Sequence, residues 1–163
     1  METLRVVVAD NSQFMRVAYK RILETEDHIQ VVGMASEGEE AIRQVESLEP
    51  DVVVLDVRMP NVNGIEVAQR VRAMRPDTGI VIISHFDDTE YIVELLKDGP
   101  EGKAYLLKTS VDDIAELIRA VGAVSQGQTV LDPSIVQRLA KAHSSQAGSP
   151  LAELTERERE VLS

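Results

Sequence analysis

The chain has 163 residues, of which 44% are hydrophobic and 28% charged, a composition typical of a folded globular protein. That length suits one domain of ordinary size with a short additional segment. The net charge of −11 disfavours electrostatic binding of nucleic acid by the chain itself. The absence of cysteine excludes disulfides and thiolate chemistry, and no apolar run approaches the roughly 20 residues that cross a bilayer. We therefore expect a cytoplasmic protein with no membrane partner.

Short apolar runs alternate with segments that have the apolar spacing of amphipathic helices. The runs predict strands at residues 4–8, 52–55, 80–83 and 104–107, with a weaker candidate at 30–34. The first three strong runs are too continuous for a half-solvated strand and too short for a helix, so they suit a sheet covered on both faces. The predicted helices carry apolar residues at Phe14, Val17, Ala18 and Ile22, then within 41–48, 65–71, 92–96 and 114–121. Capping pairs are predicted at Ser36 with Glu39, Asp87 with Glu90, and Ser110 with Asp113.

Strand followed by helix, five times over, predicts an α/β fold with a doubly wound, five-stranded parallel sheet flanked by five helices. This domain is expected to occupy residues 1–125. Residues 127–133 (GQTVLDP) are interpreted as an exit turn, and 126–150 as a linker with a short helix that opens at Pro133. Residues 151–163 restart a helix, with Thr155 and Glu158 as a capping box, and are interpreted as the start of a second domain.

Polar residues follow four of the predicted strands directly. Asp10 and Asn11 follow the first strand, and the others are Asp56, Ser84 and Lys108. The carboxyl ends of parallel strands meet at one edge of a sheet, where ligand crevices form, so these side chains are expected to converge. A single aspartate after a strand is more often a turn or cap residue, and only the conjunction favours a site.

Each of these residue types has a role in phosphoryl transfer. A carboxylate can accept a phosphoryl group, Mg²⁺ prefers oxygen ligands, and a hydroxyl and an ammonium can receive phosphoryl oxygens. Asp56 is the preferred nucleophile because it ends a central strand and a turn beginning at Arg58 follows it. Asp10 and Asn11 are the natural metal ligands. His85 is interpreted as a plain edge residue and Tyr105, on propensity alone, as core.

These residues resemble the receiver domain of two-component response regulators. The resemblance covers residues 4–122 and rests on VVVLDVRMP at 52–60, Asn63-Gly64, residues 81–84 and YLLK at 105–108. VLDP at 130–133 and LTEREREVL at 154–162 resemble the NarL/FixJ-type subfamily, whose effector is a LuxR-type helix-turn-helix domain. The resemblance implies a flavodoxin/CheY-like sheet with strand order 2-1-3-4-5 and makes 151–163 the truncated start of that effector.

The resemblance further implies a phosphorylation switch. A sensor histidine kinase would phosphorylate Asp56, and Mg²⁺ would be held by Asp10, Asp56 and the backbone carbonyl of Arg58, with Asn11 beside them. Lys108 would pair with the phosphoryl group while Ser84 and Tyr105 reorient as switch residues. The readout would be homodimerisation and DNA binding through the effector domain of the full-length protein, not through this chain. Apart from its own phosphorylation and dephosphorylation, no enzymatic activity is expected.

Two departures from the family pattern leave alternatives open. Asn11 stands where the family usually has a second acid, which predicts weaker Mg²⁺ binding and suggests a receiver-like interaction domain that works without phosphorylation. The segment 98–103 looks longer than the usual loop, so the switch surface is expected to differ. A phosphatase of the haloacid dehalogenase type is a further alternative, but it needs an acid where this chain has Arg58.

Overall fold

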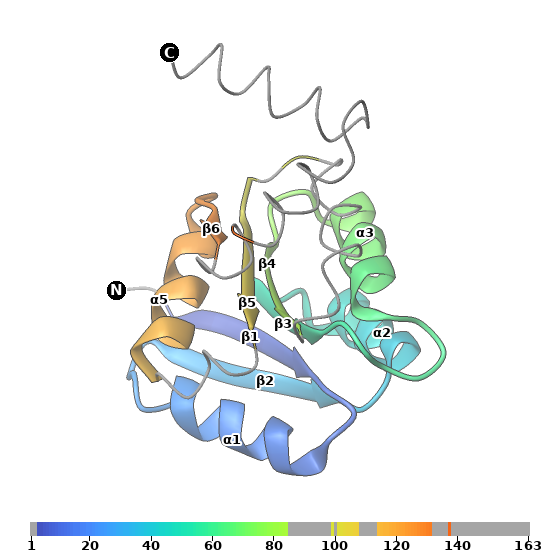
Figure 1. The fold of residues 1–163 in the computed structure, drawn as a ribbon, viewed down its shortest axis with the longest axis horizontal. Helices are drawn as coiled ribbons and strands as arrows, with labels where there is room; N and C mark the ends of the chain where they lie inside the picture. The colour runs from blue at the N-terminus through green and yellow to red at the C-terminus, as the bar shows by residue number, and fades with distance from the viewer. Residues whose placement is uncertain (1–2, 85–98, 100, 108–113, 132–136, 138–163) are drawn as a thin grey trace.

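A sheet of six parallel strands forms the centre of the molecule, in the order β2-β1-β3-β4-β5-β6 (Figure 1). The structure, a computed structural model, describes residues 3–84, 99, 101–107, 114–131 and 137. The strands are β1 (Leu4–Ala9), β2 (Ile29–Ala35), β3 (Val52–Asp56), β4 (Gly79–Ser84), β5 (Lys103–Leu107) and β6 (Val130–Leu131). The predicted α/β class, the parallel sheet and the order of the first five strands are therefore confirmed.

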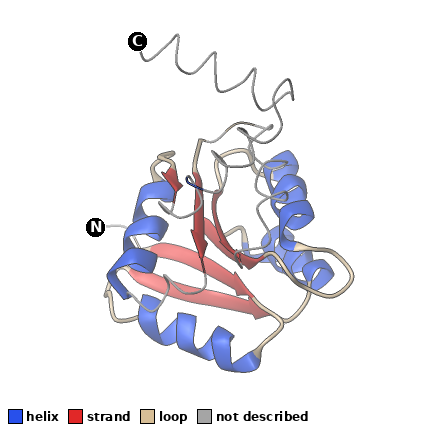
Figure 2. Ribbon diagram, in the orientation of Figure 1, coloured by secondary structure: helices blue, strands red, loops and turns tan. Residues whose placement is uncertain are grey.

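Helices cover both faces of this sheet (Figure 2). On one face lie α1 (Gln13–Leu23) and α5 (Ile114–Ser125), and on the other α2 (Gly38–Leu48) and α3 (Gly64–Met74). Every residue of β3 and β4 is buried, and along β3 the side chains alternate between the two helical layers. Burial on both faces is why these strands are continuously apolar in sequence. In the part of the chain that the structure describes, no helix is long and apolar enough to span a membrane.

The predicted apolar face of α1 is wrong at Phe14 and correct at Ile22. Phe14 is 79% exposed, whereas Tyr19 and Leu23 are buried and Met15 and Ile22 pack beside them. These four positions fall at i, i+4, i+7 and i+8, which is the spacing of one helical face. The Tyr19 ring fits this face although its hydroxyl is polar, and the predicted face did not include it.

One of the predicted helix caps is also wrong. The N-cap of α2 is Glu37, not Ser36, and the Glu37 side chain makes no capping bond. α1 and α3 are instead capped by Ser12, whose Oγ accepts from the Met15 N–H at 3.3 Å, and by Asn63, whose Oδ1 accepts from the Glu66 N–H at 2.9 Å. The other two predicted caps, at 87 and 110, lie outside the described residues.

The sixth strand occupies part of the segment that the sequence analysis interprets as an exit turn. β6 pairs with β5 in parallel, with Val130 opposite Ala104 and Leu131 opposite Tyr105. Two residues are too few for strand periodicity, so the sequence carries no signal for this strand. The predicted helices at 92–96 and after Pro133 lie outside the described residues, as does the segment 138–163.

A buried tyrosine hydroxyl lies between α1 and the sheet. Tyr19 is 1% exposed, and its Oη has no hydrogen-bond partner in the described part of the structure. Burial raises the pKa of Tyr19 above its ordinary value, and the negative charges of Asp10 and Asp56 raise it further. The folded state therefore holds this phenol in its neutral form.

We expect Tyr19→Phe to raise the free energy of unfolding at pH 7 by about 1 kcal/mol, because it removes a buried hydroxyl that lacks a partner. The advantage should grow above pH 10, where tyrosine ionises in the unfolded chain, whose reference pKa is 10.0, but not in the folded one. Wild-type stability then falls by up to about 1.4 kcal/mol per pH unit more than that of the variant. Urea unfolding of both proteins at pH 7 and pH 11 measures the difference, and a less stable variant at pH 7 would contradict it.

Candidate functional site

The parallel register brings the predicted polar residues to one edge of the sheet. Ala9 lies opposite Leu55, so Asp10 follows β1 where Asp56 ends β3. In the same way Asp56 pairs with Ile83, and Ser84 ends β4 one residue later. Neighbouring strands lie about 4.8 Å apart, so the three side chains start from adjacent positions at this edge. Lys108 and His85 lie outside the described residues.

Asp10 is fully buried and organises the turn from β1 into α1. Its N–H donates to the carbonyl of Ala35 at 3.1 Å, which continues the pairing with β2. Its Oδ1 accepts from the Ser12 N–H at 2.8 Å, and its carbonyl accepts from Arg16 Nη1 at 2.7 Å. Asn11, between these contacts, is exposed. The carboxylate is thus held by local backbone at the start of α1, with Asn11 at the surface beside it.

Asp56 is 2% exposed and is held from two sides. Its Oδ1 accepts from the Arg58 N–H at 3.2 Å, which orients the carboxylate toward the loop after β3. The start of α3 packs on its backbone, since a Cβ at Gly64 would collide with the Asp56 carbonyl oxygen. The Gly64 N–H also donates to the carbonyl of Val57 at 2.9 Å. Glycine at 64 therefore allows the helix to begin directly beside the predicted acceptor.

Ser84 and Tyr105 are both fully buried. Ser84 Oγ has no hydrogen-bond partner in the described part of the structure, an arrangement that costs free energy unless something supplies a partner. Tyr105 lies at the centre of β5 and packs in the core cluster that faces α2 and α3, where Leu131 of β6 also packs. The core position given to Tyr105 on propensity is confirmed.

Asp10 and Asp56 bring two carboxylates to one buried edge of the sheet. The charges of both Asp10 and Asp56 act on the Tyr19 hydroxyl, which the sequence analysis did not select. Its only sequence signal is its place four residues before Leu23 on the buried face of α1. Among the described residues, no group of three or more histidine, aspartate or glutamate side chains could hold a metal ion. Mg²⁺ usually keeps several waters and needs only one or two carboxylates, so the donor set at this edge fits it.

Comparison with known proteins identifies the family of this chain. Residues 6–122 match the model of the response regulator receiver domain. The chain is 36% identical to the transcriptional regulatory protein DegU of Brevibacillus brevis, over 98% of the chain and 73% of that protein. It is 34% identical to the oxygen regulatory protein NreC of Staphylococcus epidermidis, over 98% of the chain and 75% of that protein.

Solved structures of response regulators are also similar to this chain. The signal receiver domain of the putative response regulator NarL from Mycobacterium tuberculosis is 33% identical, with a TM-score of 0.71, over 78% of this chain and all of that one. A LuxR-family two-component response regulator from Aurantimonas is 26% identical, with a TM-score of 0.75, over 88% of this chain and 99% of that one. The chain therefore belongs to the response regulator receiver domain family of two-component systems, among relatives of the NarL and DegU type.

Proposed function

We propose that Asp56 accepts a phosphoryl group from a sensor histidine kinase and that this event switches the protein. The observation that carries the proposal is the pair of buried carboxylates, Asp10 and Asp56, at the ends of neighbouring strands. Two carboxylates at one buried edge can serve together as ligands of a divalent cation, and one of them can accept a phosphoryl group. A haloacid dehalogenase type of phosphatase is not favoured, because Arg58 stands where that chemistry needs an acid.

The oxygen atoms at this edge support a Mg²⁺ site. The ligands would be the carboxylates of Asp10 and Asp56 and the backbone carbonyl of Arg58, with Asn11 beside them. When bound, Mg²⁺ would offset the negative charge that phosphoryl transfer gathers there. The buried position of both carboxylates supports this role, since a low dielectric strengthens their attraction for a cation.

In the transfer step, one carboxylate oxygen of Asp56 forms a bond to phosphorus. The bond from phosphorus to the donor breaks, and its electron pair leaves with the donor, which is a histidine nitrogen of the kinase or the acetate of acetyl phosphate. The product is an acyl phosphate on Asp56. The Arg58 N–H at 3.2 Å from Oδ1 holds the carboxylate during this step. Lys108 would pair with the transferred group.

The switch would begin at Ser84. Its buried Oγ has no partner in the described part of the chain, and a phosphoryl oxygen on Asp56 would supply one. Tyr105 would then move into the space behind Ser84. Because Leu131 of β6 lies opposite Tyr105, this movement would reach the segment that leads out of the domain. A homodimer formed on this changed surface would bring two effector domains to DNA.

The segment after β6 is proposed to connect to a LuxR-type helix-turn-helix domain that begins at residues 151–163, with 126–150 as the linker. The match to DegU supports this arrangement, because it extends over 98% of the chain and the chain spans about three quarters of that protein. DNA binding is therefore assigned to the effector domain, which agrees with the net charge of −11 on the residues present.

Incubation with acetyl phosphate and Mg²⁺ should add about 80 Da, the mass of one phosphoryl group, to the intact chain. Asp56→Asn should abolish the gain, because an amide cannot form the acyl phosphate. Asp51→Asn is the matched control: Asp51 is exposed before the other end of β3 and should keep the gain. If wild type gains no mass at saturating Mg²⁺, the interaction domain that works without phosphorylation becomes the better hypothesis.

Asn11→Asp should tighten Mg²⁺ binding. A unit charge at contact distance contributes between about 1 and 4 kcal/mol, depending on the effective dielectric, before desolvation is subtracted. Asn11 is exposed, which places the gain toward the lower figure, about fivefold in affinity. Mg²⁺ titration of wild type and variant, followed by phosphorylation rate at each concentration, measures it. Equal affinities would refute the assignment of position 11 to the metal site.

A further inference from the structure

The loop that follows Asp56, residues 57–63, contains a strained turn. The Val62 N–H donates to the carbonyl of Pro60 at 2.8 Å, which closes a turn with Asn61 at its centre. Asn61 has φ of 70°, in the left-handed region that residues other than glycine seldom occupy. Three-residue turns of this kind are rare and costly, and they persist only where surrounding contacts hold them.

From inside, this loop is held by packing. Val57, Met59 and Val62 are buried in the core cluster between the sheet and the helices α2 and α3. The start of α2 touches the loop backbone, since a Cβ at Gly38 would collide with the Val62 carbonyl oxygen. The underside of the loop therefore rests directly on the first residue of α2.

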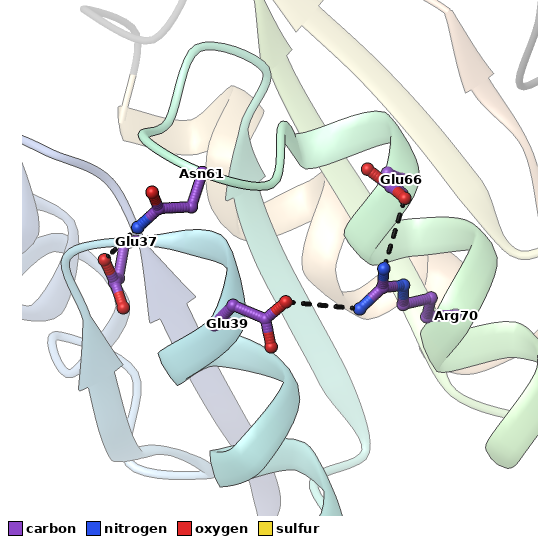
Figure 3. Close-up of polar contacts among 5 residues, drawn as sticks. All are labelled: Glu37, Glu39, Asn61, Glu66 and Arg70. Atoms are coloured by element: carbon purple, nitrogen blue, oxygen red, sulfur yellow. Dashed lines mark hydrogen bonds and ion pairs between the residues drawn. The ribbon is translucent and has the colours of Figure 1, made fainter.

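On its outer side, a polar contact joins the turn of the loop to the start of α2. Asn61 Nδ2 donates to Glu37 Oε2 at 2.6 Å (Figure 3). Glu37 is the N-cap residue of α2, yet its side chain makes no bond to its own helix and instead reaches Asn61. The contact is exposed, so it adds little to stability, but it fixes the side chain of the residue that holds the positive φ.

A second contact joins α2 to α3 without touching the loop. Arg70 of α3 lies 3.4 Å from Glu39 of α2 and 3.2 Å from Glu66 of its own helix (Figure 3). These residues are about half exposed, where ion pairs contribute little. Glu37 and Glu39 are thus two glutamates at the start of one helix, of which only Glu37 contacts the turn after Asp56.

We infer that the contact between Glu37 and Asn61 positions the loop for phosphoryl transfer, which makes both of them positioning residues. The inference rests on the proposed function. Arg58 lies between Asp56 and the turn, its N–H holds the Asp56 carboxylate, and its carbonyl is the proposed metal ligand. If the turn relaxes, the Arg58 peptide groups rotate, and the carboxylate and the metal ligand lose their alignment together.

The test measures phosphorylation by acetyl phosphate as a function of Mg²⁺ concentration. Glu37→Ala and Asn61→Gly, whose glycine tolerates the positive φ, should each lower the rate at limiting Mg²⁺ by roughly three- to tenfold. The double variant should lose no more than either single one, because the same hydrogen bond is removed once. Glu37→Gln keeps an acceptor oxygen and should restore most of the rate. Glu39→Ala is the matched control and should behave like wild type.

Three results would overturn the inference while the proposed function stands. The first is a wild-type rate in Glu37→Ala and Asn61→Gly. The second is a lower melting temperature in these variants with an unchanged Mg²⁺ dependence, which would give the contact a purely structural role. The third is an equal loss in Glu39→Ala, which would assign the effect to surface charge. If wild type itself takes up no phosphoryl group, the proposed function fails and the inference falls with it.

Discussion

The parallel alignment of β1, β3 and β4 is the constraint on which the rest of the structure depends. With every strand running the same way, residues that follow three separate strands end at one edge, although 74 positions separate Asp10 from Ser84. That alignment requires helical crossovers, which here cover both faces and bury β3 and β4 completely. The same burial that makes the sheet stable removes the edge residues from water. Stability of the core and the electrostatics of the site therefore have one origin.

Much of this fold could be predicted from local pattern. Strands buried on both faces are continuously apolar, and this pattern predicts β1, β3, β4 and β5. The polar residues at the carboxyl ends of β1, β3 and β4 then predict Asp10, Asp56 and Ser84 as site residues. Sequence pattern failed where tertiary packing decides. The apolar face of α1 includes Tyr19 and excludes Phe14, because the helix presents the face that fits the sheet and not its largest apolar residue. A two-residue strand such as β6 has no period to detect.

Contacts between distant polar side chains could not be predicted either. Glu37 and Asn61 are 24 residues apart, and no sequence motif links the two positions. Arg72 of α3 likewise has a charged side chain, which is typical of a surface residue. Its guanidinium in fact donates to the carbonyls of Thr78 and Gly102 at 2.8 and 2.9 Å, and burial lowers its pKa. Such contacts depend on how the loops return to the sheet, which single-sequence periodicity does not describe.

Several groups at the carboxyl edge carry a cost that the rest of the domain must offset. The hydroxyls of Tyr19 and Ser84 have no partner among the described residues, and Asn61 holds a positive φ. Folding tolerates any one of these groups as an ordinary structural residue. Their concentration around Asp56, inside an otherwise consistent α/β core, is what a site under functional constraint produces, because stability alone favours replacing each of them. A ligand that accepts a hydrogen bond from the Ser84 hydroxyl would recover part of that cost. The unpartnered hydroxyl therefore gives this edge a physical reason to bind a group that brings an acceptor oxygen to it.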